Sequence, residues 1–533
     1  MSSIKFISVC AIFALVVTPN IASKILAIVP TATYSHQLAF RNVWIALANR
    51  GHQVTLLTTH PMNNPDLKNL REIDTGSSSK IVEDYIELIH KSPESKAFKL
   101  MTSSFDDTMR HQLSLEPVRN LIHNESGFDL VITESIAYEF LAFADLYKCP
   151  RVLVSSFQPL NFVLSVLGNP TSPAIPTIEI SILTGQVGNT FYIRFKGFMM
   201  SLLYLLFKWV EHLPLRHEIL KEAFGPNVRR PTEILRDTDL LLISSSPIIT
   251  GITSVGPNIV HIGDGLHNFP PKPLPKDLQK FLDSATEGCI YFSLGTNSKG
   301  TYLPPEEIQL FLDTFKELPY KVLWKFENVD MIKPPKNVKL MPWLPQQDVL
   351  RHPNVKLFIM QGGLQSLEES ILSRVPMLII PGWYTDQKAN AMQMELKGVA
   401  RIVHHKPLPS KEYLTEVIND VITNPKYIDN VNKIADLITD QPMKGVDKAV
   451  WWIEYVLRHK GAKHLRHPAI DIPFYQYYCL DSISVVIGIV VSVCAILIWI
   501  AKKILRAVVG ILHKSTPTVN KKKVTTKRSK KDS

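Results

Sequence analysis

The chain has 533 residues, of which 45% are hydrophobic and 20% are charged, and this length and composition exclude a disordered chain and predict more than one folded domain. Residues 502–533 contain nine Lys and two Arg against one Asp, so this segment accounts for almost all of the net charge of +11. The basic balance therefore lies in a tail and argues against a nucleic-acid-binding surface.

The N-terminus has the features of a secretory signal peptide. Lys5 precedes a short apolar run, Phe6–Val17, and the small residues Ala22 and Ser23 follow. A basic start, an apolar core too short to cross a bilayer and a small-residue cleavage region are typical of such peptides. We predict that residues 1–23 are removed, with an uncleaved anchor as the alternative.

The next segments predict an α/β domain with a parallel sheet. Ile25–Val29 is a short apolar strand, Leu38–Asn49 has the apolar spacing of a helix, and Gln53–Leu57 is a second strand. This strand–helix–strand unit predicts parallel strands with helices on both faces of the sheet. Residues 24–256 are therefore expected to form an N-terminal Rossmann-like domain, with further strands at Leu130–Thr133, Arg151–Val154 and Leu240–Ser244.

A proline-rich segment separates this domain from a second one. Four prolines between positions 270 and 275 break the pattern, and residues 257–282 are predicted to be a linker. A second α/β domain is expected over residues 283–440, with strands at Cys289–Ser293, Lys321–Lys325, Val338–Met341, Leu357–Met360 and Met377–Ile380. The predicted fold is α/β, with two Rossmann-like domains facing a cleft where ligands bind beyond the carboxyl ends of the strands.

The C-terminal region predicts a return toward the first domain and then a membrane crossing. Residues 441–480 are expected to be helical, with a basic, aromatic helix at Trp451–Pro468. Residues 482–501 carry no charge, and these twenty residues have the length of a transmembrane helix. Because the basic tail 502–533 follows, the positive-inside bias predicts a single-pass type I protein with luminal domains and a cytosolic tail.

Two short motifs are compatible with this topology. Asn124 begins a sequon for N-glycosylation, which requires the luminal side. Lys530 and Lys531 lie four and three positions from the C-terminus, counting the last residue as one. A lysine pair at this offset resembles the dilysine signal through which coat machinery returns membrane proteins to the endoplasmic reticulum. The alternative is one more pair in a lysine-rich tail.

The segment from Trp343 to Gln387 predicts a phosphate site. A predicted strand runs into Gly362 and Gly363, and a helix is expected directly afterwards. The glycines let the backbone approach a pyrophosphate, and the N-terminus of the helix offers unpaired N–H groups and the positive end of its dipole. Asp386 and Gln387, at the end of the segment, are suitable partners for sugar hydroxyls.

Together, these motifs resemble the signature of the UDP-glycosyltransferase family, which includes the UDP-glucuronosyltransferases. The resemblance covers nearly the whole mature chain, including Phe292–Thr296 and Trp452–His459, and it extends to the insect, membrane-bound branch of the family. It implies a GT-B-like architecture in which the first domain binds an acceptor and the second binds a UDP-sugar as co-substrate. It implies neither a cofactor nor a metal ion.

By position, the resemblance also implies roles for individual residues. Trp343 would stack on uracil, with Gln346 near the edge of the base, and Glu369 would accept hydrogen bonds from the ribose hydroxyls. Asp386 and Gln387 would hold the hydroxyls of the sugar. The phosphates would be lined by Ser293, Gly295, Thr296, Gly362, Gly363 and Ser366.

Two positions of this site depart from the usual family pattern. Gln361 stands where His usually precedes the glycine pair, and Gln365 stands where Asn is usual, although the insect branch is similar in both features. A neutral amide can donate a hydrogen bond to phosphate but supplies no charge. Stabilisation of the leaving group is therefore expected to depend more on the helix end and on hydroxyls.

His36 is the predicted general base. It lies where the first strand meets its helix, and the resemblance assigns it this role, although a lone His is otherwise more often structural. The start of a helix disfavours imidazolium, so we expect neutral His36. The family usually orients the base with an Asp at the end of a later strand, and here Glu134 occupies that place and is expected to orient His36.

The expected reaction is the inverting transfer of a hexose to a hydroxyl of a small lipophilic acceptor, as in detoxification or in conjugation of hormones and pigments. The insect-type resemblance favours UDP-glucose over UDP-glucuronate as the donor, and no basic residue identifiable from the sequence is dedicated to a sugar carboxylate. The apolar segment Tyr192–Trp209 is interpreted as a wall of the acceptor pocket or a membrane-surface patch, with a buried helix as the alternative. Assembly of identical chains is left open.

Two alternative interpretations concern other classes of protein, and one further motif needs a separate explanation. The chain would be a catalytically silent luminal binding or scaffold protein on the same fold, or a lipid-handling membrane protein. The sequence Asp237-Thr238-Asp239 matches the acidic triplet of metal-dependent glycosyltransferases, but we expect it to be a turn between a helix and a strand.

Overall fold

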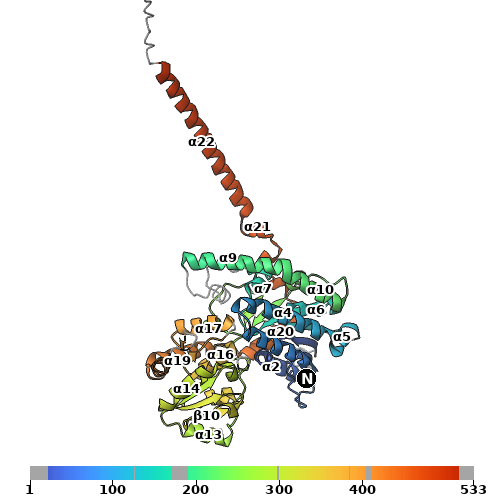
Figure 1. Ribbon diagram of the computed structural model, residues 1–533. Coiled ribbons are helices and arrows are strands. Elements are labelled where there is room, and N and C mark those ends of the chain that lie inside the picture. Colours follow the sequence, from blue (N-terminus) through green and yellow to red (C-terminus); the bar gives the residue numbers. More distant parts are fainter. Residues whose placement is uncertain are drawn as a thin grey trace, which may run out of the picture. The chain divides into compact units, whose positions relative to one another are not determined.

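The computed structural model describes residues 22–124, 127–169, 190–296, 299–382, 385–403, 408 and 410–514. Most of the predicted signal peptide, the last two residues of the sequon and the C-terminal lysine pair lie outside the described residues. The chain separates into two compact units, one ending at Ile470 and the other beginning at Asp471. Both domains that the sequence predicts belong to the first unit (Figure 1).

The first domain is built on a seven-stranded sheet with the strand order β3-β2-β1-β4-β5-β6-β7 in the described chain. Every neighbouring pair of these strands is parallel. The strands are β1 (Lys24–Val29), β2 (Gln53–Thr58), β3 (Leu70–Asp74), β4 (Leu130–Glu134), β5 (Arg151–Ser155), β6 (Leu240–Ile243) and β7 (Ile259–His261).

Both faces of this sheet are buried, because alternate residues of the central strands enter different apolar clusters. Leu26 and Ile28 of β1 belong to one cluster, and Ile25 and Ala27 of the same strand belong to the other. The helices in this part of the described chain are α2 (Tyr34–Asn49), α3 (Ser79–His90), α4 (Glu94–Ser114), α5 (Glu116–His123), α6 (Ala142–Tyr147), α7 (Asn161–Val166), α9 (Phe191–Phe207), α10 (Leu213–Phe224), α11 (Pro231–Arg236) and α12 (Pro247–Thr250).

The two edge strands of this sheet were not predicted from the sequence. β3 is mostly polar and half-exposed, and β7 has three residues, so neither contains the apolar run of a buried strand. β7 also lies inside the segment predicted as a linker, as does most of α13 (Lys276–Asp283). The irregular chain between the domains is therefore shorter than residues 257–282.

The second domain is built on a six-stranded sheet with the order β10-β9-β8-β11-β12-β13, again parallel throughout. Its strands are β8 (Cys289–Ser293), β9 (Lys321–Lys325), β10 (Val338–Met341), β11 (Val355–Met360), β12 (Met377–Ile379) and β13 (Ala400–Ile402). Its helices are α14 (Pro305–Glu317), α15 (Gln346–Leu350), α16 (Leu364–Leu372), α17 (Thr385–Leu396), α18 (Lys411–Thr423) and α19 (Pro425–Thr439). Only β13, another short edge strand, was missing from the sequence-based prediction.

After the second domain, the chain returns to the first one through α20 (Gly445–Arg458), which lies beside α2 (Figure 1). Ala449, Val450, Ile453 and Val456 of α20 belong to the apolar cluster on one face of the first sheet. A helix was predicted at Trp451–Pro468, but the observed helix begins earlier, at Gly445, and ends earlier, at Arg458. Its end is followed by Gly461, which has a φ of 118° that only glycine adopts easily.

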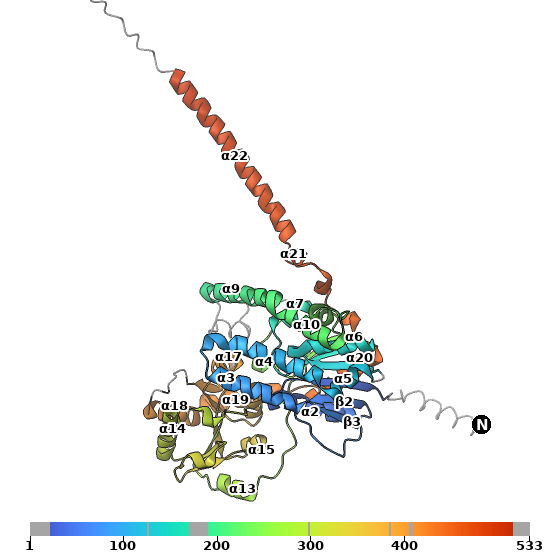
Figure 2. The same ribbon diagram turned by 45° about the vertical axis from the view of Figure 1, so that its right-hand side comes forward.

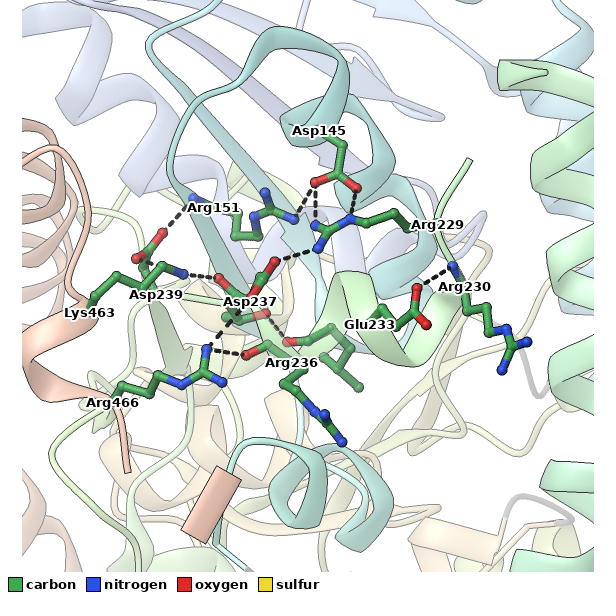
Figure 3. Close-up of polar contacts among 12 residues, drawn as sticks. Asp145, Arg151, Arg229, Arg230, Glu233, Arg236, Asp237, Asp239, Lys463 and Arg466 are labelled. Carbon is green, nitrogen blue, oxygen red and sulfur yellow. Dashed lines mark hydrogen bonds and ion pairs between the residues drawn. The ribbon is translucent and has the colours of Figure 1, made fainter. Parts of the chain in front are cut away.

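Ion pairs hold the segment after α20 against the first domain (Figure 3). The Lys463 Nζ lies 3.3 Å from Asp239, and the Arg466 guanidinium lies 3.6 Å from Asp237. Asp237 also pairs with Arg229 at 2.6 Å, and Asp239 accepts a hydrogen bond from the backbone N–H of Ala462. The acidic triplet thus lies between α11 and β6, as expected, and its two carboxylates contact basic and backbone groups of the protein itself.

The second unit contains α21 (Phe474–Tyr477) and the long helix α22 (Leu480–Lys514). Among the described residues, α22 alone is long and apolar enough to cross a membrane by length and composition. The helix extends past the uncharged stretch 482–501, because Lys502, Lys503 and Arg506 are good helix formers and continue it.

Candidate active site

A cavity of about 1440 Å³ lies between the two domains, at the carboxyl ends of β1, β4 and β5 on one side and of β8 and β11 on the other. It is lined by thirteen of the predicted site residues: His36, Ser293, Gly295, Thr296, Trp343, Gln346, Gln361, Gly363, Gln365, Ser366, Glu369, Asp386 and Gln387. Glu134 lies behind His36, Gly362 lies in the turn beneath the cavity wall, and Asn124 ends α5 outside the cavity.

The predicted base and its predicted orienting residue are in direct contact. His36 lies in the first turn of α2, and Glu134 is the last residue of β4, which neighbours β1 in the sheet. The Nδ1 of His36 lies 2.5 Å from Glu134 Oε1. Because the Glu134 side chain is fully buried and the His36 side chain is 20% exposed, the imidazole lies between the carboxylate and the cavity.

Two hydroxyl residues that the sequence did not reveal complete the surroundings of Glu134. Thr31 Oγ1 donates to Glu134 Oε2, and Ser156 Oγ donates to Glu134 Oε1, each over 2.5 Å. Ser156 Oγ also lies 3.0 Å from His36 Nδ1. Thr31 follows β1 and Ser156 follows β5, the two strands beside β4, so their position directly after a strand was the available signal.

These contacts favour an ionised Glu134 and a basic His36. Burial alone would raise the pKa of Glu134, but the charge of His36 and the hydrogen bonds from His36, Ser156 and Thr31 lower it. Burial alone would lower the pKa of His36, but the charge and hydrogen bond of Glu134 raise it. The Glu134 carboxylate therefore opposes the effect of the helix start, and the net shift in the pKa of His36 is upward.

The contact with Glu134 also selects a tautomer of His36. A carboxylate can only accept a hydrogen bond, so Nδ1 carries the proton that faces Glu134 Oε1. In the neutral imidazole, Nε2 then holds the lone pair. This is the arrangement required of a side chain that takes a proton from a hydroxyl group in the cavity.

In the second domain, Trp343 presents an indole ring to the cavity. Its side chain is 55% exposed, and the ring of Tyr34 from the first domain lies edge-on to it, with the centroids 5.9 Å apart. Lys325 Nζ lies 5.8 Å from the centre of the indole. An exposed aromatic face flanked in this way is a suitable surface for a flat base.

A network of amides and carboxylates lies beside Trp343. Gln346 Nε2 donates to Glu369 Oε2 over 2.6 Å and to Ser366 Oγ over 2.8 Å, and Gln347 Nε2 donates to Glu369 Oε1 over 2.8 Å. His267, from the chain between the domains, has its Nε2 3.5 Å from Glu369. Neither Gln347 nor His267 was identified from the sequence: Gln347 lies within the segment Trp343–Gln387 but was given no role, and His267 lies outside that segment.

These neighbours keep Glu369 ionised. Burial alone would raise the pKa of its carboxyl group, but His267, Gln346 and Gln347 together lower the pKa. An ionised carboxylate has lone pairs beyond those that the two glutamines occupy. Glu369 can therefore accept hydrogen bonds from a diol at the edge of the cavity.

The glycine turn before α16 and the loop that faces it each require glycine at one position. Gly362 has a φ of 99°, and a Cβ there would lie 2.8 Å from the Gln387 carbonyl oxygen. Gly295, in the facing loop, has a φ of 90°, and a Cβ there would lie 2.4 Å from Gln361 Nε2. The backbone of both loops is thus close-packed around the N-terminus of α16, which can offer its N–H groups to an anion.

The sugar-contacting candidates lie at the start of α17. Gln387 Oε1 accepts a hydrogen bond from Gly382 N over 3.1 Å, and Asn390, which the sequence did not reveal, donates to Gly362 O over 3.0 Å. Burial raises the pKa of Asp386, and the charge of His36 opposes that rise. Asp386 of the second domain and His36 of the first are therefore close enough to interact electrostatically across the cavity.

The side chain of Gln365 contacts the first domain, which a residue that only binds phosphate would not do. Its Nε2 donates to the backbone carbonyl oxygen of Ser156 over 3.0 Å, which joins α16 to the loop after β5. Because the Ser156 hydroxyl contacts Glu134 and His36, this hydrogen bond connects the donor half of the cavity to the predicted base.

Lys325 is a cation of the cavity that the sequence analysis missed. It is the last residue of β9, and its Nζ donates to Gly295 O over 2.9 Å and pairs with Glu327 at 2.7 Å. A charged residue at the carboxyl end of a buried strand was the available signal. The positive charge of Lys325 lies in the same loop region as Gln361, whose neutral amide supplies no charge.

Comparison with known proteins agrees with this geometry. The chain matches the UDP-glucuronosyl and UDP-glucosyl transferase family over residues 23–515. Two solved structures share the fold. The glycosyltransferase of kitacinnamycin has a TM-score of 0.56 and 17% identity, and the match covers 81% of this chain and 98% of that one. The calicheamicin glycosyltransferase CalG4 has a TM-score of 0.54 and 16% identity, and the match covers 82% of this chain and 99% of that one. The fold is thus that of the two-domain GT-B glycosyltransferases.

Curated relatives cover most of the chain. UDP-glycosyltransferase UGT5 of Dactylopius coccus is 31% identical over 92% of this chain and 93% of its own length. UDP-glucuronosyltransferase 2B7 of Homo sapiens is 32% identical over 88% of this chain and 92% of its own. An ecdysteroid UDP-glucosyltransferase of a Spodoptera littoralis nuclear polyhedrosis virus is 29% identical over 87% of this chain and 93% of its own length. The chain belongs to the UDP-glycosyltransferase family and is an enzyme of that family.

Proposed function

We propose that the enzyme transfers a hexose from a UDP-sugar to a hydroxyl group of a small lipophilic acceptor, with inversion at the anomeric carbon. The observation that carries this proposal is the His36–Glu134 pair of the first domain, which faces Asp386 and the glycine turn of the second domain across one cavity. A base on one side and a nucleotide-sugar site on the other are the two parts that such a transfer needs.

In the proposed mechanism, Nε2 of His36 accepts the proton of the acceptor hydroxyl while its oxygen attacks the anomeric carbon. The new bond forms on the face opposite the UDP, the bond to the β-phosphate oxygen breaks, and UDP leaves. An α-linked donor therefore gives a β-glycoside. Glu134 stabilises the imidazolium that forms, through its 2.5 Å contact with Nδ1.

The departing UDP would be stabilised by several groups of the second domain. The N-terminus of α16 offers N–H groups, and Ser293 and Ser366 line the same part of the cavity. Lys325 supplies positive charge near Gly295, and Gln361 supplies an amide. We propose that no metal ion takes part, and full activity in EDTA is the expected result.

Glucose is the favoured sugar, with glucuronate as the second candidate. Asp386 and Gln387, the residues assigned to the sugar hydroxyls, carry no positive charge, and Asp386 would repel a sugar carboxylate. Relatives of both kinds exist, since one bears the name UDP-glucosyltransferase 2 and another the name UDP-glucuronosyltransferase 2B7. Competition between UDP-glucose and UDP-glucuronate for UDP release separates the two candidates.

We also propose that α22 anchors the enzyme in the endoplasmic reticulum membrane, with both domains in the lumen. The length and composition of α22, the basic residues after it and the sequon at Asn124 support this orientation. If the Asn124→Gln variant lacks a glycan that the unsubstituted protein carries, the two proteins differ in gel mobility, and that difference would place this part of the chain on the luminal side.

The central test is His36→Ala in the full chain, with a panel of phenols and alcohols as acceptors. We expect sugar transfer to fall by about a hundredfold or more, whereas UDP binding, measured separately, stays unchanged. Unchanged turnover would remove His36 from the mechanism. UDP binding without transfer to any acceptor in the unsubstituted protein would instead support the catalytically silent alternative.

A further inference from the structure

The acceptor half of the cavity has an apolar wall from two helices. Phe98 of α4 contacts the rings of Tyr204 and Phe207 of α9, with centroids 6.1 and 5.5 Å apart, and α9 lies above α4 in the view of Figure 2. Met101 and Leu203 line the same wall. A lipophilic body fits this surface, in agreement with the interpretation of residues 192–209 as part of the pocket wall.

One part of this apolar wall is polar. α9, the π-helical turn η3 (Lys208–His212) and α10 follow each other without a break, so Lys208, His212 and Arg216, spaced four apart, lie on one face. All three line the cavity, although each side chain is about 5% exposed or less. Single π-helical turns inside α-helices are frequent at functional sites.

His212 is a buried imidazole without a partner among the described residues. Neither ring nitrogen makes a hydrogen bond there, and Nε2 lies 3.7 Å from Asp106, beyond hydrogen-bond distance. The hydroxyl of Thr108 in α4, which also lines the cavity, is likewise without a partner in the described part of the chain. Buried polar groups of this kind are costly unless something bonds to them.

The charges around His212 are arranged with the cations toward the cavity. Arg216 pairs with Asp106 at 2.8 Å and with Glu139 at 2.7 Å, and these two carboxylates do not line the cavity. Lys208 Nζ lies 4.8 Å from the centre of the Phe162 ring. Burial, followed by the charges of Arg216 and Lys208, lowers the pKa of His212 to about 2, so the ring is neutral and its one N–H group is a hydrogen-bond donor.

From this arrangement we infer that Lys208, His212 and Thr108 form a subsite for a carboxylate of the acceptor. The inference rests on the proposed function and narrows its acceptor to an amphipathic hydroxy acid, with a hydroxyl at His36, an apolar body along α4 and α9, and an acid group at η3. The ammonium, the imidazole N–H and the hydroxyl are three donors suited to one monoanion. A dianion fits less well, because the two carboxylates behind Arg216 already offset its charge.

The experiment compares ω-hydroxydodecanoate with its methyl ester as acceptors for the full chain with UDP-glucose. These probes share the hydroxyl and the apolar body and differ in charge at the far end. In Lys208→Met, we expect kcat/KM for the acid to fall about tenfold, while kcat/KM for the ester changes less than about twofold. Lys221→Met, a change of the same type at α10 outside the cavity lining, is the matched control and leaves both values unchanged.

Two outcomes would overturn the subsite. An equal fall for acid and ester in Lys208→Met would mean that Lys208 only supports the wall, and unchanged values for both would mean that no carboxylate binds there. A second variant, His212→Phe, keeps the volume of the ring and removes its N–H group. It is expected to weaken selection of the acid over the ester about threefold, and retained selectivity in both variants contradicts the inference.

Failure of the proposed function gives a different result. If the unsubstituted protein transfers sugar to neither probe, direct binding of the two probes is measured by thermophoresis without a donor. Preferred binding of the acid that disappears in Lys208→Met would support the subsite even without catalysis. Equal binding of acid and ester to the unsubstituted protein would overturn it.

Discussion

At the scale of single residues, the reactivity of His36 depends on one carboxylate and the two hydroxyls that hold it. Glu134 is fully buried, and a buried carboxylate is stable only when its lone pairs have donors. Thr31, Ser156 and His36 supply them, each at 2.5 Å. The extra methylene of Glu relative to the Asp expected at this place is accommodated because three strands, β1, β4 and β5, converge on it.

Replacing Glu134 by Gln tests this arrangement. The substitution keeps the shape of the side chain but removes the charge that stabilises imidazolium, so kcat is expected to fall by about a hundredfold. The Kd for UDP should not change, because Glu134 lies in the other domain behind His36. Glu134→Asp is the control that keeps the charge, and it should retain more activity than Glu134→Gln. Equal activity of both variants would contradict an electrostatic role.

The pH dependence of acceptor kcat/KM gives an independent prediction. The base works only when His36 is deprotonated, so activity rises with pH through the pKa of His36. Glu134 raises that pKa, so the midpoint of the rise should lie above 6.5, the ordinary histidine value. The Glu134→Gln variant lacks the negative charge that raises the pKa of His36, so the midpoint should move to lower pH. A midpoint that stays in place would assign the titration to another group.

Some of these residues were predictable from the sequence and others were not. His36, Glu134 and Trp343 lie in motifs or at the ends of apolar strands, where the resemblance to the family gives each a proposed role. His267 and Lys325 could not be found in this way, because their roles arise from neighbours distant in sequence, such as Glu369, about a hundred positions after His267. Thr31 and Ser156 follow strands, but only the strand order brings them to Glu134.

At the scale of elements, α16 connects the two halves of the cavity. Its first turn carries Gln365, whose amide bonds to the Ser156 carbonyl of the first domain, and its later residue Glu369 belongs to the nucleotide half. The apolar strands of both sheets and the helix after the first strand were predictable from periodicity, whereas no bounds were predicted for most other helices. The edge strands β3, β7 and β13 were not predictable, since short or half-exposed strands lack the apolar run on which such predictions depend.

Replacing Gln365 by Leu removes the hydrogen bond between α16 and the loop that carries Ser156. One neutral hydrogen bond is worth about 1 kcal/mol, so kcat is expected to fall about fivefold while the KM for the UDP-sugar changes less. Gln309→Leu on the exposed face of α14 is a matched control. A rise in KM alone would instead make Gln365 a donor ligand, which is the role that the sequence suggested.

At the scale of the whole molecule, the first domain is completed by chain that follows the second. α20 contributes Val450, Ile453 and Val456 to the core against the first sheet. Asp237 and Asp239 then bind Arg466, Lys463 and the backbone of the segment behind α20 (Figure 3). The two domains are therefore not independent along the sequence, and the C-terminal boundary of the folded body lies near Ile470, where the compact unit ends.

Two truncations of the full-length chain test this boundary. A chain that ends at Ile470 keeps the core and the ion pairs and loses α22, so it should fold, stay in solution after lysis without detergent, and bind UDP with an unchanged Kd. A chain that ends at Lys444 loses three buried aliphatic side chains, worth about 2 kcal/mol each. This sum is comparable with the whole stability of a typical domain, so the shorter chain should not give a cooperative melting transition.

The comparison of the two truncations distinguishes anchoring from folding. If the chain ending at Ile470 stays with the membrane after a high-salt wash, the exposed apolar residues of α9, such as Phe195 and Leu206, hold it there independently of α22. If the chain ending at Lys444 melts cooperatively at an unchanged temperature, α20 is an accessory helix and the packing against α2 does not stabilise the first domain. If the chain ending at Ile470 folds and leaves the membrane, while the chain ending at Lys444 does not fold, then α20 completes the core of the first domain and α22 is the anchor.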